Sequence, residues 1–145
     1  MLRTIAQILD SKGHEVWCVA PEDKIADALN IMRNKQVGAL VVLEDRQVVG
    51  LFSERDYATK VDFCGSNCAV MTVRDVMTNE VYCVTLETSI DEAMVLVTKS
   101  RCRHLPVIEN DQLVGLVSIG DLVKATIDEK DFLIKQLTQY IKGGE

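Results

Sequence analysis

The sequence lacks several features that would assign it to a broad class at once. No uninterrupted apolar run in its 145 residues approaches the roughly 18 that span a bilayer, so we expect no membrane segment. The N-terminal stretch has no long apolar core with a small-residue cleavage site, so we expect no secretory leader. The chain has no basic block and a formal net charge of −6, which argues against nucleic acid as its partner.

Recognisable catalytic motifs are missing as well. The sequence contains no P-loop, suggests no serine–histidine–acid order, and offers His104 no obvious nucleophile. We therefore do not expect an enzyme. The five cysteines are an odd number in a sequence that is 48% hydrophobic and core-forming, which predicts reduced thiols and a cytoplasmic setting.

What the sequence does contain is an internal repeat. A shift of 65 residues aligns 16–61 with 81–126 without a gap, and 15 of the 46 aligned positions are identical. In the clearest match, VVGLFSERDY (48–57) faces LVGLVSIGDL (113–122), so that a glycine, a serine and an aspartate recur at one spacing. The repeat divides the chain into four parts: a first repeat at 4–61, a linker at 62–71, a second repeat at 72–126 and a C-terminal amphipathic helix and tail at 127–145.

Both repeats predict the element order β-α-β-β-α. Short runs of β-branched and aromatic residues predict strands at 16–21 and 81–86. Apolar residues three and four positions apart predict helices within 22–35 and 88–100. One unit of roughly 50 residues buries too little surface to be stable alone. We therefore expect an α/β (α+β) fold in which the two units pack about a pseudo-twofold axis.

Three short motifs give this arrangement a family resemblance. DVMT (75–78) precedes the second repeat, RHLPV (103–107) lies in its middle and GLVSIGD (115–121) precedes its last helix. Together with the tandem β-α-β-β-α units, they resemble a pair of cystathionine-β-synthase (CBS) domains over residues 4–126. The resemblance implies regulatory binding of an adenosine-containing ligand such as AMP, ATP or NADH. It also implies a homodimer.

Ser118 and Asp121 admit two interpretations. A serine followed three residues later by an acid at a helix start is the pattern of a helix cap. The same carboxylate could accept hydrogen bonds from both ribose hydroxyls, and the resemblance implies this role. We prefer Asp121 to Asp56 because Arg103, His104 and Pro106 precede it. Guanidinium groups suit phosphate geometry, so we predict that Arg103 and His104 face a phosphate, whereas Arg101 is interpreted as ordinary surface charge.

The first repeat offers a different set. Ser53, Arg55 and Asp56 repeat the helix-start pattern, with Arg55 in place of Gly120. The small residues Gly38 and Ala39 would leave room for an adenine ring where the second repeat has Arg103 and His104. The remaining candidates are one polar residue after a strand and two apolar pocket residues: Thr85, Val19 and Ile119. The unequal charges predict at least one nucleotide site and leave the second undecided.

Two other functions remain open at this stage. The chain could be a structural adaptor that dimerises and docks an unknown protein target without a ligand. Alternatively, Cys64 and Cys68 in the linker could form a thiol- or metal-responsive switch, although a metal would need two further ligands, and we predict no metal site. In the tail, Leu133 or Ile134, Leu137 and Ile141 share one helical stripe, which could pack on its own module but which we expect to cover a dimer partner.

Overall fold

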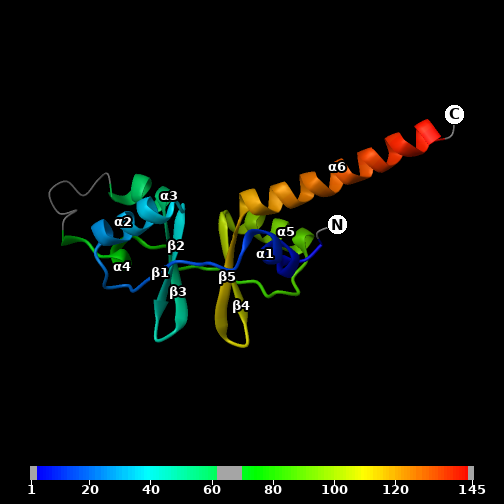
Figure 1. The fold of residues 1–145 in the computed structure, drawn as a ribbon. Helices are drawn as coiled ribbons and strands as arrows, with labels where there is room; N and C mark the ends of the chain where they lie inside the picture. Colours follow the sequence, from blue (N-terminus) through cyan, green and yellow to red (C-terminus); the bar gives the residue numbers. More distant parts are fainter. Residues whose placement is uncertain (1–2, 62–69, 144–145) are drawn as a thin grey trace.

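The computed structural model describes residues 3–61 and 70–143, and it has the mixed α/β fold that the sequence predicts. Two β-hairpins lie next to each other at the centre, and the helices lie to either side of them (Figure 1). The elements in chain order are α1 (Ile5–Lys12), β1 (Cys18–Val19), α2 (Ile25–Lys35), β2 (Ala39–Glu44), β3 (Gln47–Ser53), α3 (Glu54–Asp56), the π-helix η1 (Tyr57–Val61), α4 (Val73–Val76), α5 (Ile90–Ser100), β4 (His104–Glu109), β5 (Gln112–Ser118) and α6 (Ile119–Gly143).

The two hairpins repeat each other in detail. Strands β2 and β3 pair antiparallel, as do β4 and β5, and each hairpin shifts register after the same aligned position, Val42 in one and Val107 in the other. Both hairpins turn through two residues with positive φ, at 45–46 and 110–111. That backbone conformation matches the right-handed twist of a tight hairpin. The internal repeat therefore extends to backbone geometry.

The first strands of the two repeats differ. In the first repeat, β1 pairs parallel to β2, and the Val41 N–H donates to the Trp17 carbonyl at 3.0 Å. The aligned residue in the second repeat is Pro106, which has no N–H to donate. The strand predicted at 81–86 is consequently reduced to one isolated parallel bridge between Val84 and Val107.

Each repeat is completed by a helix that precedes the other one. Ile5, Ile8 and Leu9 of α1 belong to the core of the second repeat, whereas Val73 and Val76 of α4 belong to the core of the first. Equivalent backbone bonds secure both crossings: the Ile5 N–H donates to the Thr88 carbonyl, and the Val73 N–H donates to the Asp23 carbonyl. Residues 4–12, which the sequence division grouped with the first repeat, therefore pack on the second.

Two aligned glycines allow the exchanged helices and the residues after them to approach the hairpins closely. A Cβ at Gly50 would lie 2.9 Å from the Thr78 carbonyl oxygen, and one at Gly115 would lie 2.7 Å from a Leu9 methyl group. The Thr78 carbonyl cannot easily move, since it accepts the Leu51 N–H at 3.0 Å. The close approach of Thr78 and of Leu9 therefore leaves no room for a side chain at Gly50 or at Gly115.

Gly50→Ala is therefore expected to lower the free energy of unfolding by about 1–3 kcal/mol through overpacking. Gly120→Ala is the matched control, because a Cβ there meets only the Ser118 hydroxyl at an ordinary 3.5 Å. Alanine also favours a helix by up to about 1 kcal/mol over glycine, so this control should be neutral or stabilising. Urea denaturation measures both, and equal stability of the two variants would contradict the close approach.

The last helix is longer than the sequence division suggests. The sequence predicts a short helix ending near residue 126 and a separate tail helix, but α6 runs unbroken through both and extends away from the body (Figure 1). Its apolar residues Val123, Ile127, Ile134 and Leu137 are exposed. Coverage of this face by a second copy stays a prediction. Within the described residues, no helix has the length and hydropathy needed to cross a membrane.

Candidate functional site

Two clefts lie where the repeats meet, and the 65-residue shift relates them. The first cleft has a volume of about 640 Å³ and the second about 200 Å³. Leu51 and Ser53 line the first, and their aligned partners Leu116 and Ser118 line the second. Tyr82 lines the first, and its partner Trp17 lines the second. Each cleft therefore combines the end of a hairpin from one repeat with the entry segment of the other.

Asp56 is the acidic centre of the first cleft. Its carboxylate accepts the Ser53 N–H at 3.0 Å and the Thr78 hydroxyl at 2.9 Å, and it pairs with the Lys60 ammonium at 3.2 Å. The residue is only 6% exposed, yet it lines the cleft. The helix-cap interpretation and the cleft interpretation of this carboxylate are therefore both consistent with the structure.

Cations from both repeats line the same cleft as this carboxylate. Arg55 and Lys60 come from the segment after β3, while Arg101 and Arg103 come from the segment between α5 and β4. Arg101, interpreted from the sequence as ordinary surface charge, ends α5 in a left-handed conformation at the cleft. An acid that can accept sugar hydroxyls thus lies in one cavity with guanidinium groups that can bind phosphate.

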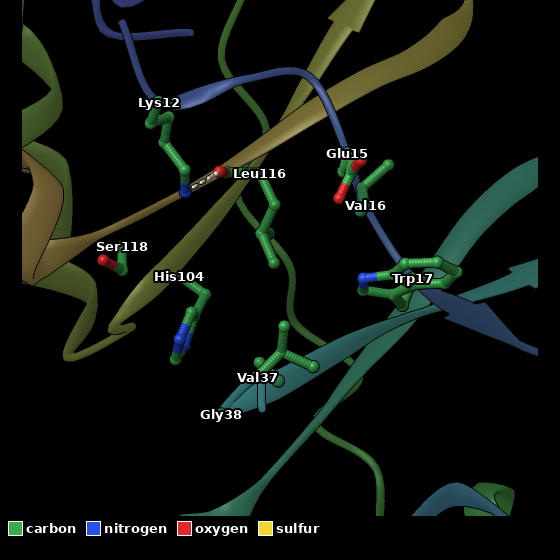
Figure 2. A pocket seen from close by; sticks show the side chains of 10 residues that line it. Lys12, Glu15, Val16, Trp17, Val37, Gly38, His104, Leu116 and Ser118 are labelled. Carbon is green, nitrogen blue, oxygen red and sulfur yellow. Dashed lines mark hydrogen bonds between the residues drawn. The ribbon is translucent and has the colours of Figure 1, made fainter. Parts of the chain in front are cut away.

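The second cleft is arranged differently around its acid. Figure 2 shows the Lys12 side chain reaching in from the end of α1, with His104, Gly38 and Trp17 across the cavity. The Lys12 ammonium donates to the Leu116 carbonyl at 2.9 Å and to the Asp121 carboxylate at 2.7 Å. Asp121 itself does not line this cleft but a third, smaller pocket of about 110 Å³.

Burial and neighbouring charges shift the pKa values of two groups beside the second cleft, Asp121 and His104. Partial burial raises the pKa of Asp121, but hydrogen bonds from Lys12 and Ser118 outweigh it and hold that pKa below its usual value. Burial is the largest influence on His104 and lowers its pKa, with Lys12 and Arg103 adding to the effect and Asp121 and Asp56 opposing it. His104 lines both clefts, and its lowered pKa favours the neutral imidazole.

The predicted site residues are distributed unevenly between these cavities. The first cleft brings together Ser53, Arg55, Asp56, Gly38, Arg103 and His104, and the second brings together Gly38, Ala39, His104 and Ser118. Five predicted residues line neither cleft: Val19 and Pro106, which are buried, Thr85 and Ile119, which are exposed, and Asp121. Their ligand-binding roles stay predictions.

The cysteine hypothesis cannot be followed in the same way. Cys64 and Cys68 lie outside the described residues. Elsewhere in the described chain, no three histidine, cysteine or acidic side chains gather in a metal-binding group.

Sequence reasoning missed several residues that line the clefts. Trp17 and Tyr82 occupy aligned positions in the segments predicted as first strands, 16–21 and 81–86, so the repeat itself was a usable signal for them. Lys60 follows Asp56 by one helical turn, which is also readable from sequence. Lys12 lies outside the gap-free alignment and reaches its partners from another element, so no local pattern marks it.

Comparison with known proteins gives consistent matches over most of the chain. A family model described as CBS domain matches residues 7–62 and 73–128. The mitochondrial CBS domain-containing protein CBSX3 of Arabidopsis thaliana is 38% identical, with 97% of this chain and 73% of that protein covered. The crystal structure of a CBS-domain containing protein from Agrobacterium tumefaciens is 35% identical with a TM-score of 0.81, and the match covers 87% of this chain and 95% of that one.

Matches to enzymes are confined to part of each enzyme. The inosine-5′-monophosphate dehydrogenase of Methanocaldococcus jannaschii is 28% identical over 76% of this chain, but the match covers only 21% of that protein.

Proposed function

The chain belongs to the CBS-domain family as a tandem pair of CBS domains, and from this premise we propose that it is a non-catalytic regulatory module that binds an adenosine-containing nucleotide in the first cleft. The observation that carries the proposal is the composition of this cleft. A cavity of about 640 Å³ lies within the range of roughly 300–1,000 Å³ that small-molecule sites occupy. It joins one buried carboxylate to three arginines from two repeats.

The parts of a nucleotide match the parts of the cleft. Asp56 can accept hydrogen bonds from ribose hydroxyls, and Arg55, Arg101 and Arg103 can share the phosphate charge. Leu51 and the exposed Tyr82 supply apolar surface for a base. Relative to the expectation from sequence, the favoured site moves from Asp121 to Asp56. The second repeat still contributes Arg103 and His104.

A thermal unfolding experiment with AMP, ATP and NADH tests this function. A ligand at 100 times its Kd should raise the free energy of unfolding by about 2.7 kcal/mol and raise the Tm accordingly. Arg103→Ala should weaken binding by roughly 10- to 100-fold, since a hydrogen bond to a charged group contributes about 1.5–3 kcal/mol. Arg33→Ala, on the exposed face of α2, is the matched control and should bind as the unmodified chain does.

Failure of all three nucleotides to shift the Tm would contradict nucleotide binding. The alternative function, a ligand-free adaptor, predicts that outcome together with a stable protein partner. Equal weakening by the Arg103 and Arg33 substitutions would instead indicate a general charge effect outside the first cleft.

A further inference from the structure

Lys12 separates two cavities beside the second repeat. Its side chain lines both the second cleft and the third pocket, with Ser118 on one side and Asp121 on the other. Its ammonium group is fixed by the Leu116 carbonyl and the Asp121 carboxylate together (Figure 2 shows the first of these bonds). The side chain therefore stands between the second cleft and the one acid that could give this cleft the chemistry of the first.

Among the residues that the structure describes, none forms an equivalent partition in the first cleft. The equivalent bonds of Ile5 and Val73 pair Leu9 with Met77, and each of these two packs against its aligned glycine. Lys12, three residues after Leu9, therefore corresponds to Glu80, an acid that lines the first cleft and has no ammonium group to donate to Asp56. Lys60 also pairs with Asp56, but it lies one turn further along the same segment, and both residues line the first cleft side by side. Asp56 consequently faces its cavity, whereas Asp121 is cut off from the second cleft.

The volume and the charge of the second cleft also disfavour nucleotide binding there. Its volume of about 200 Å³ is below the roughly 300 Å³ at which small-molecule sites begin. Glu15 contributes a negative charge to the second cleft, as Glu54 and Glu80 do to the first, but the one lysine that lines the second cleft is already paired with Asp121. A phosphate entering this cleft would meet no arginine among its lining residues.

We propose that Lys12 closes the second cleft, so that each chain binds one nucleotide, in the first cleft, and keeps a second site latent. Withdrawal of the Lys12 side chain would join the second cleft to the third pocket and expose Asp121 beside Ser118. This inference rests on the proposed function, because it concerns how many of the two clefts bind a nucleotide.

Titration calorimetry with AMP and with ATP measures the stoichiometry directly. The unmodified chain is expected to bind one equivalent. Lys12→Met, which removes the ammonium group but keeps an unbranched side chain, is expected to bind two, and Lys12→Met combined with Asp121→Ala to return to one. Lys99→Met, on the exposed face of α5 and away from all three cavities, is the matched control and should bind one equivalent.

The outcomes separate this inference from the function on which it rests. Two equivalents in the unmodified chain, or one in a folded Lys12→Met variant, would overturn the closure while leaving nucleotide binding intact. The absence of binding in every variant would overturn the proposed function itself. Lys12→Gln provides a second variant of similar length, for use if the methionine variant does not fold.

A readout without ligand tests the partition independently. Carbon-detected NMR can follow the Asp121 carboxyl group through an acid titration. Removal of the Lys12 ammonium should raise the pKa of Asp121, because one of the hydrogen bonds that lower it is lost. An Asp121 carboxyl group that titrates identically with and without Lys12 would show that the ion pair does not form in solution, and the proposal would fall.

Discussion

Leu9→Ala is expected to cost about 3–5 kcal/mol of stability and to loosen the second repeat, although residue 9 precedes the first. Leu9 is fully buried in the second core, against Gly115 of β5. Truncation of a buried leucine to alanine removes favourable transfer energy and leaves a cavity, at a typical cost of about 2–5 kcal/mol. The upper part of that range applies because α1 meets a strand position without a side chain, which has no atoms to fill the space.

Native-state hydrogen exchange can locate this loss. Amides of β4, β5 and α5 should lose protection first in the Leu9 variant, since local stability follows the packing of each cooperative unit. Val76→Ala in α4 is the matched control, because Val76 is buried in the first core. It should loosen β2 and β3 instead. Loss of protection in β2 and β3 upon substitution of Leu9 would contradict the exchange of helices between the repeats.

Asp56→Ala is expected to cost about 3 kcal/mol of stability and to abolish nucleotide binding in the first cleft. The substitution leaves the Ser53 N–H and the Thr78 hydroxyl without their acceptor in a largely buried position. Unsatisfied buried donors cost about 1–3 kcal/mol each. Loss of the ion pair with Lys60 adds little to this cost, because the Lys60 side chain is partly solvated. Chemical denaturation measures the first effect and calorimetry the second.

Two further variants separate the structural role of Asp56 from its role in the cleft. Asp75→Ala removes the same kind of helix cap, from Thr72 at the start of α4, but Asp75 is exposed and lines no cleft. It should cost about 1 kcal/mol and leave binding unchanged. Asp56→Asn keeps a carbonyl oxygen for the Ser53 N–H, so it should remain folded and still bind nucleotide weakly. Undiminished binding by Asp56→Asn would contradict the assignment of the carboxylate.

Much of the fold was predictable because both copies of the repeat keep the residues that determine local backbone structure. Gly50 and Ser53, like Gly115 and Ser118, mark a close crossing and a helix start in each copy. The lost strand at 81–86 was also readable, since Pro106 removes a donor that Val41 supplies. The core on which α1 packs could not be predicted from sequence, because the apolar face formed by Ile5, Ile8 and Leu9 would suit either core.

The site was predictable in its residue types but not in their grouping. Proximity in sequence groups Arg103 and His104 with Asp121 of the same repeat, but the first cleft combines them with Asp56 of the other. Packing about a pseudo-twofold axis decides this grouping, and no spacing along the chain reports it. The role of Lys12 depends on the same long-range packing, because α1 must first cross to the second repeat before its last residue can reach Asp121.

The continuous course of α6 gives the second repeat a lever arm. The helix begins directly after Ser118, and its 25 residues correspond to a length of about 37 Å at a rise of 1.5 Å per residue. A tilt of only about 5° at its first turn would sweep the far end through about 3 Å, by simple rotation of a rod of that length. Rearrangements at the Lys12–Asp121 pair, too slight to disturb either core, would therefore be magnified at the periphery of the molecule.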